Sequence, residues 1–136
     1  MGYAHAVESP PPADPDALPV ARISVEEALA RHRAGQRVVF VDARHPADWR
    51  RAIDKLPGAC RLSPDPDDTL PMLPAGRTVV TYCSCPGDAS SSAVARILCS
   101  GGAGSVRVLA GGLRAWRRAG GPVEPVAPRR FEAQPR

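Results

Sequence analysis

The sequence predicts an α/β fold in which helices flank both faces of a parallel β-sheet. Three runs of strand-forming apolar residues lie at 38–41, 78–82 and 105–109. Segments with apolar residues at helical spacing separate these runs. Strands that alternate with helices pair in parallel, because each helix carries the chain back across one face of the sheet. Continuous apolar strands are typical of a sheet that is covered on both faces.

The first predicted element is a helix that follows Ser24. Ser24 and Glu27 have the spacing of a capping box, in which each side chain satisfies a backbone amide of the first helical turn. An apolar face follows, formed by Val25, Ala28 and Leu29. Gly35 ends this helix, and the first buried strand begins shortly after it.

Between the first and second strands, the pattern predicts a short helix and a loop. The helix covers residues 47–52, with Trp49 facing inward. The stretch 63–74 is rich in proline and aspartate, which favour turns and irregular structure.

After the second strand, residues 90–99 have helical spacing, and glycines stop this helix before the third strand. Its apolar positions are Ala93, Val94, Ile97 and Leu98. Gly111 and Gly112 follow the third strand and are expected to form a turn with unusual backbone dihedrals. A last short helix is predicted over residues 113–118, with Trp116 packed in the core and its N–H at the edge.

The domain is predicted to span residues 21–124, between a Pro-rich arm at 1–20 and a tail at 125–136. Both flanking segments lack the apolar residues needed to fold alone, so we expect them to be flexible. The N-terminus lacks the basic and apolar regions of a signal peptide. No apolar run approaches the roughly 20 residues that span a membrane. We therefore expect a cytoplasmic protein that does not bind membranes.

The composition narrows the function classes further. The net charge of +4 comes from arginines that are interspersed with acids, so no long basic stripe suggests nucleic-acid binding. A mild positive field instead suits a small anionic substrate. The spacing of the four cysteines does not suggest a disulfide framework, and a reducing cytoplasm keeps thiols free.

Cys83 and Cys85 lie in the segment that joins the strand at 78–82 to the next helix. In open α/β sheets, sites form beyond the C-terminal ends of the strands. Unpaired amides and the helix dipole at a helix start stabilise a thiolate. Such a thiolate can attack a sulfur donor and hold the transferred sulfur as a persulfide. The rest of the predicted substrate-binding loop is Pro86, Gly87, Asp88, Ala89, Ser90 and Ser91.

The roles within this loop have competing interpretations. Ser90 and Ser91 are expected to cap the helix and donate hydrogen bonds to an anion, while backbone amides supply most of the stabilisation. Alternatively, the loop is an ordinary turn and its cysteines are simply buried. A metal site is disfavoured, because Cys-x-Cys is tighter than usual zinc spacing and no histidine pair accompanies it. We expect no metal or other cofactor, and Cys60 and Cys99 are interpreted as core or surface thiols.

Taken together, these features resemble the rhodanese family of sulfurtransferases. The resemblance runs from about Ile23 to Glu124. Three segments carry it: a strand with an Asp-x-Arg ending at 39–46, the cysteine loop after Tyr82, and a C-terminal signature at 108–116 and 121–123. The resemblance implies a rhodanese-like parallel sheet, a cysteine persulfide intermediate and thiosulfate-like donors.

The loop departs from the family pattern, because many members close it with an arginine that is absent here. Counting back from the helix makes Cys85 the nucleophile and puts Ser90 at the closing position. Counting forward from the strand selects Cys83, because the family cysteine usually follows the tyrosine directly. We favour Cys85, since loop length determines where the amides converge. Cys83 is then a resolving thiol, or else the nucleophile itself. Pro86 has no N–H and removes one donor to the sulfur of Cys85.

The resemblance implies a single-domain sulfurtransferase that moves sulfane sulfur from thiosulfate or a persulfide to a thiol, cyanide or a protein acceptor. Asp42 and Arg44 either form an ion pair that orients the loops or contact the substrate. The alternative is a catalytically weak binding or redox-sensing module, favoured by the missing arginine and the charge of Asp88. Phosphatase-like or arsenate-reductase-like chemistry is a third option, which the missing arginine disfavours.

Overall fold

The computed structural model describes residues 20–64, 73, 76–84 and 86–126. Most of the predicted arm at 1–20 and of the tail at 125–136 lies outside these residues, as does most of the predicted loop at 63–74. Cys85 also lies outside the described residues.

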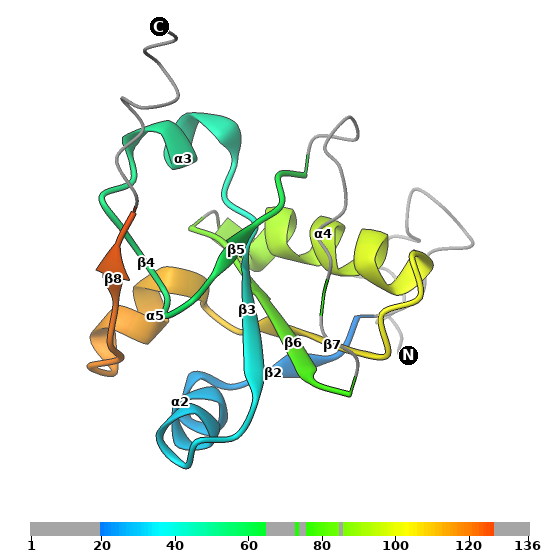
Figure 1. The fold of residues 1–136 in the computed structure, drawn as a ribbon. Helices are drawn as coiled ribbons and strands as arrows, with labels where there is room; N and C mark the ends of the chain where they lie inside the picture. Colours follow the sequence, from blue (N-terminus) through cyan, green and yellow to red (C-terminus); the bar gives the residue numbers. More distant parts are fainter. Residues whose placement is uncertain (1–19, 65–72, 74–75, 85, 127–136) are drawn as a thin grey trace, which may run out of the picture.

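The centre of the fold is a five-stranded parallel sheet with the strand order β2-β7-β6-β3-β5 (Figure 1). The strands are β2 (Arg22–Ile23), β7 (Ser105–Leu109), β6 (Thr78–Tyr82), β3 (Val38–Asp42) and β5 (Cys60–Arg61). The three central strands confirm the predicted apolar runs. The two-residue edge strands β2 and β5 were not predicted, because two residues are too few to show a period.

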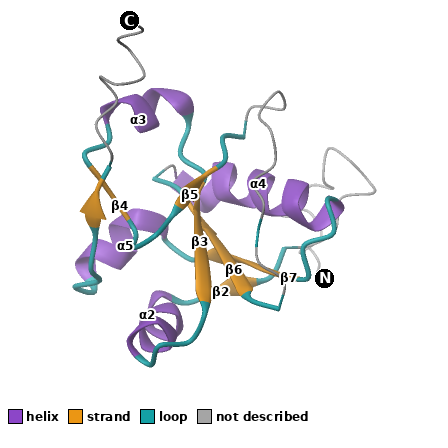
Figure 2. Cartoon of the chain, viewed as in Figure 1, coloured by secondary structure: helices purple, strands orange, loops and turns teal. Residues whose placement is uncertain are grey.

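Helices cover both faces of the sheet, as the sequence predicts (Figure 2). One face carries α4 (Ala89–Ser100), which packs on β6 and β7. The other carries α2 (Val25–Arg33) and α5 (Gly112–Arg118), which also contact each other. The short helix α3 (Pro46–Arg51) follows β3.

Each face of the sheet has its own apolar core, because successive side chains of a strand point to opposite faces. On β3, Phe40 packs in the cluster with the residues of α2 and α5, whereas Val41 packs in the cluster with those of α4. The ring of Trp116 meets that of Phe40 edge-on, with centroids 5.3 Å apart. Its Nε1 donates to the Pro122 carbonyl over 2.8 Å, so the prediction of a core tryptophan with its N–H at the edge is confirmed.

The starts of α2 and α4 differ from each other in how they are capped. In α2, the Ser24 hydroxyl accepts from the Glu27 amide over 3.0 Å, which confirms that half of the predicted capping box. In α4, the N-cap residue is Asp88, whose side chain makes no cap hydrogen bond, and Ser90 and Ser91 lie inside the helix. The predicted serine caps are therefore wrong. The helix begins earlier, after Asp88, whose carboxylate is bound elsewhere.

A second, antiparallel pair of strands joins β4 (Asp54–Lys55) to β8 (Glu124–Pro125). This ribbon was not predicted, because its strands are about 70 residues apart and only two residues long. Trp49 of α3, which was predicted to face inward, is half-buried. No residue of α3 is fully buried, and Trp49 lies beside the guanidinium groups of Arg44 and Arg61, at 5.7 and 4.9 Å from its ring centre.

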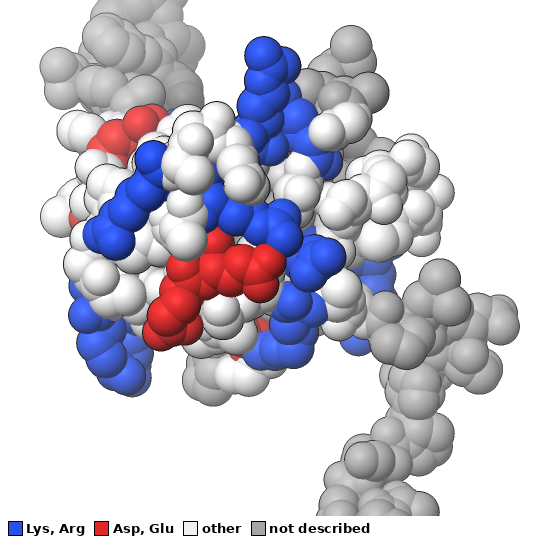
Figure 3. All heavy atoms as spheres, turned by 90° about the horizontal axis from the view of Figure 1, so that it is seen from below, with Lys and Arg blue, Asp and Glu red and all other residues white. Residues whose placement is uncertain are grey.

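The surface does not show one continuous basic stripe on the face seen in Figure 3. There, Lys and Arg side chains lie in several separate places around a central group of acidic side chains. In the described part of the chain, no helix has the length and apolar character required to cross a bilayer.

Candidate functional site

The candidate site lies where the central strands end. Asp42, the last residue of β3, pairs in register with Tyr82, the last residue of β6. The cysteine loop follows β6 directly and leads through the 3-10 turn η1 (Pro86–Asp88) into α4. This is the edge at which parallel α/β sheets form their sites, because successive loops meet there.

A buried polar network forms the floor of this edge. The Asp42 carboxylate accepts from Arg44 Nη2 over 2.6 Å and from the Tyr82 hydroxyl over 2.8 Å. Both Asp42 and Arg44 are almost fully buried. Burial by itself would lower the pKa of Arg44, but the hydrogen-bonded carboxylate of Asp42 raises that pKa above its ordinary value. Burial and the charge of Asp42 raise the pKa of Tyr82, so its hydroxyl stays protonated and donates.

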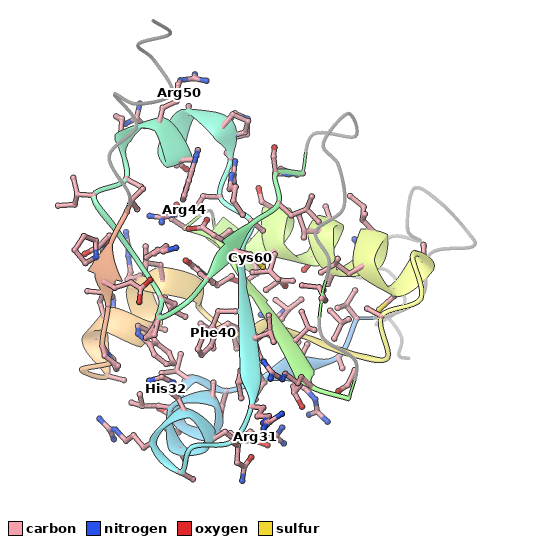
Figure 4. All side chains as sticks on the ribbon, viewed as in Figure 1. Arg31, His32, Phe40, Arg44, Arg50 and Cys60 are labelled. Atoms are coloured by element: carbon pink, nitrogen blue, oxygen red, sulfur yellow. The ribbon has the colours of Figure 1, made fainter. Side chains whose placement is uncertain are left out.

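The same network connects segments that are distant in sequence. Arg44 Nη2 also donates to the Asp54 carbonyl over 2.8 Å, and the Tyr82 oxygen accepts from the Leu56 amide over 3.1 Å. Figure 4 shows Arg44 between α3 and the end of β3. The structure thus contains the ion pair that the sequence suggested, and this pair holds the loops around the site.

Cys83 is buried beneath the loop, with 1% of its surface exposed. Its Sγ lies 3.4 Å from the Ser91 hydroxyl, which in turn donates to the Asp88 carbonyl over 3.1 Å. Its own carbonyl accepts from the Leu113 amide over 3.0 Å. The thiol of Cys83 therefore lies between β6 and the first turn of α4.

The Gly111–Gly112 turn packs against the cysteine loop. Both glycines have positive φ, at 80° and 59°, which confirms the prediction of unusual dihedrals. A Cβ on Gly112 would lie 2.2 Å from the Cys83 carbonyl oxygen, a distance that no side chain tolerates. Glycine at this position therefore allows the turn after β7 to touch the loop after β6.

We expect Gly112→Ala to destabilise the fold by about 2–4 kcal/mol, through a strained dihedral and displacement of the Cys83 carbonyl. Gly102→Ala is the matched control: its φ is 95°, but nothing lies within 4 Å of the added Cβ. That control should lower the free energy of unfolding by only about 1–2 kcal/mol. Urea unfolding of both variants measures the difference. Equal losses would show that close packing at Gly112 contributes nothing.

A pocket of about 330 Å³ lies directly beside the cysteine loop. Its lining includes three arginines, one carboxylate, two apolar side chains, an alanine and a loop serine: Arg44, Arg51, Arg117, Asp48, Ile53, Leu113, Ala52 and Ser84. Of these, the sequence interpretation had singled out Arg44 alone as part of the site. No local motif marks the other arginines, because they come from two helices far apart in the chain.

Two of these arginines combine an ion pair with a solvent-exposed side chain. Arg51 pairs with Asp48 over 3.1 Å, and Arg117 pairs with Asp54. The side chains of Arg51 and Arg117 are 75% and 49% exposed. Ion pairs at such exposed positions contribute little to stability. The pocket therefore has a positive wall next to Ser84, which precedes Cys85 in the chain.

The other thiols lie away from this loop. Cys60 is on β5, where its Sγ lies 3.7 Å from the Phe40 carbonyl, and burial raises the pKa of its thiol (Figure 4). Cys99 is exposed near the end of α4. Within the described ranges, no group of three or more His, Cys, Asp or Glu residues is arranged to hold a metal ion.

The sheet, its flanking helices and a cysteine loop at the C-terminal end of β6 together define a class of α/β domain. The chain belongs to the rhodanese-like domain family, whose model matches residues 24–119. This match covers most of the range over which the sequence resembled the family.

Solved structures agree with this assignment. A protein of unknown function from Rhodopseudomonas palustris, described as a possible tyrosine phosphatase, is 31% identical, with a TM-score of 0.61 over 77% of this chain and 85% of that one. The rhodanese-like domain of an Anabaena protein is 25% identical, with a TM-score of 0.63 over 77% and 79%. A rhodanese-related protein from Thermoplasma volcanium, 18% identical, shares the fold with a TM-score of 0.59 over 76% and 97%. No curated protein matches the chain.

Proposed function

We propose that the protein is a sulfurtransferase whose Cys85 carries sulfur as a persulfide. The Cys85 thiolate attacks the outer sulfur of thiosulfate; a new S–S bond forms, the donor's S–S bond breaks, and sulfite leaves with the electron pair. An acceptor thiolate or cyanide then attacks the persulfide, takes the outer sulfur and releases the Cys85 thiolate. With an organic persulfide as donor, the leaving group is its thiolate. The reaction needs no cofactor.

Membership of the rhodanese-like family, together with a cysteine loop at a strand-to-helix junction, is the observation that carries this proposal. The edge of a parallel sheet collects loop amides and the start of a helix in one place. Both stabilise negative charge on sulfur. The reaction requires such stabilisation twice, for the attacking thiolate and for the thiolate that is released.

The burial of Cys83 supports Cys85 as the nucleophile. A cysteine residue that is 1% exposed does not meet a donor in solution without local opening of the loop. Its contact with Ser91 also keeps the thiol of Cys83 on the inner side of the loop. Cys83 is thus proposed to support the loop, and its role as a resolving thiol is left to the test below.

The arginine-lined pocket supports an anionic donor. It contains Arg51 and Arg117, both largely open to solvent, and it reaches Ser84 in the cysteine loop. These side chains place positive charge at the mouth of the site, although the loop itself has no arginine. An anion such as thiosulfate is therefore attracted towards the loop.

The test is mass spectrometry of the protein after incubation with thiosulfate and, separately, with a small organic persulfide. We expect a gain of about 32 Da, one sulfur atom, assigned by fragmentation to Cys85 and removed by cyanide or dithiothreitol. The peptides of Cys60 and Cys99 serve as internal controls and should gain much less. Absence of the Cys85 adduct with both donors would overturn the proposed function.

A second candidate function is phosphate ester hydrolysis, favoured by the description of the Rhodopseudomonas palustris protein as a possible tyrosine phosphatase. The absent loop arginine counts against it, because that residue would hold the phosphate in a bidentate way. Hydrolysis of p-nitrophenyl phosphate separates the two functions. Cys85-dependent hydrolysis without any persulfide would favour the phosphatase. A protein inactive in both assays would be a binding or redox-sensing module.

A further inference from the structure

Asp88 is a buried acid within the cysteine loop, three positions after Cys85. Its φ of 57° is the only positive one outside glycine in the described part of the chain. A non-glycine residue keeps such a conformation only where its surroundings determine it, and this costs about 1–3 kcal/mol. The contacts of Asp88 therefore indicate what holds the loop in place.

These contacts come from three other elements. The carboxylate accepts from the Gly111 amide over 3.1 Å and forms an ion pair with Arg22 of β2. The Asp88 carbonyl accepts from the Ser91 hydroxyl in α4 over 3.1 Å. The side chain of Asp88 is 5% exposed and that of Arg22 is 51% exposed. Asp88 thus ties the loop to β2, to the turn after β7 and to α4.

We infer that Arg22 and Asp88 form a charge clasp that sets which donors Cys85 accepts. The clasp consists of the ion pair between these two side chains and the hydrogen bond from Gly111. It fixes the loop where many family members use an arginine, and it neutralises the single carboxylate that the loop contains. Arg22 is then a positioning residue that permits anionic donors. This inference rests on the proposed role of Cys85.

The physical basis is the balance of charge within the cysteine loop, in which Asp88 follows Cys85 by three positions in the sequence. Asp88 brings one negative charge into the loop, and Arg22 is the cation that pairs with it. Without Arg22, the Gly111 amide still holds the carboxylate in place, but its charge is no longer balanced. A dianion such as thiosulfate is then repelled, whereas a neutral reagent of similar size is not. The clasp therefore predicts that removing Arg22 slows the reaction of Cys85 with anionic reagents more than with neutral ones.

Alkylation of Cys85 tests this inference independently of sulfur transfer. Iodoacetate and iodoacetamide react in the same way: the thiolate forms an S–C bond, and iodide leaves with the electron pair. They differ mainly in charge. In Arg22→Gln, we expect the iodoacetate-to-iodoacetamide rate ratio at Cys85 to fall about fivefold, and less at high salt. The KM for thiosulfate should rise by at least the same factor, with kcat within about twofold.

The double variant Arg22→Gln/Asp88→Asn restores charge balance and should return the ratio to within about twofold of wild type. Asparagine keeps an oxygen for the Gly111 amide and tolerates a positive φ. Arg31→Gln is the matched control, because it removes the same charge from an exposed pair with Glu27 near the start of β6. We expect no change in the ratio for this control.

The outcomes separate this inference from the proposed function. An unchanged ratio in Arg22→Gln, with Cys85 still alkylated and still forming a persulfide, would overturn the charge clasp alone. The charge clasp would also be overturned if Arg22→Gln slowed alkylation by both reagents equally and the double variant did not restore the rates. Such a result would indicate a structural defect. Lack of Cys85 alkylation by either reagent, together with no persulfide, would overturn the proposed function and this inference with it.

Discussion

Replacing Cys85 with serine is expected to reduce sulfur transfer from thiosulfate at least about 1,000-fold. A serine hydroxyl is not ionised near neutral pH and cannot hold sulfur as a persulfide. The mass gain of one sulfur atom should disappear from the loop peptide in the same variant. Steady-state turnover with cyanide as acceptor, followed as thiocyanate formation, measures the loss.

Cys83→Ser is the matched control for this experiment, because it makes the same chemical change two residues away. The buried serine keeps a donor and an acceptor for the Ser91 hydroxyl, so the loop should retain its form. We expect turnover within about threefold of wild type and a stability loss of about 1–2 kcal/mol. If the pattern were reversed, Cys83 would be the nucleophile. Persulfide formation with impaired release to a thiol would make Cys83 the resolving thiol.

Arg44→Leu is expected to destabilise the fold by about 3–5 kcal/mol. The substitution removes the nearest cation of the buried Asp42 carboxylate and leaves only Arg61, whose Nη1 lies 3.8 Å away. A poorly compensated buried charge is more costly than the loss of the pair itself. It also removes the hydrogen bond to the Asp54 carbonyl. Chemical denaturation monitored by circular dichroism measures the change, and the slope of the transition should stay constant if unfolding is still two-state.

Two further variants make this prediction specific. Arg51→Leu removes an arginine from the same pocket whose partner, Asp48, remains in contact with water. That control should change stability by less than about 1 kcal/mol. Adding Asp42→Asn to Arg44→Leu removes the stranded charge and should recover part of the loss. If Arg44→Leu were no more costly than Arg51→Leu, the buried network would not hold the loops together.

The three central strands and the helices α2, α4 and α5 were predictable from the sequence. Each depends on local signals: a run of β-branched residues, apolar spacing of helical type, or a capping residue such as Ser24. The short strands β2, β4, β5 and β8 were not predictable. They exist because a partner strand lies beside them, and two residues alone show no pattern.

The position of the cysteine loop was also predictable, because a buried strand ends at Tyr82 and a helix begins within a few residues. The ion pair of Asp42 with Arg44 followed from the same reasoning about strand ends. The start of α4 was misjudged, because serines are good caps in general. Here the preceding Asp88 turns away to bind Arg22, which is 66 residues distant.

By itself, the sequence determined how the main strands and helices succeed one another along the chain. It also determined which segment contains Cys83 and Cys85. Both depend on patterns among neighbouring residues. Only the tertiary structure decided that Cys83 is buried, that Arg51 and Arg117 line one pocket with Ser84, and that Arg22 pairs with the acid of the loop. These contacts join residues whose separation along the chain carries no information about their separation in space. The charge and accessibility of the candidate site therefore arise from folding, while the cysteines proposed to act there belong to one segment of the sequence.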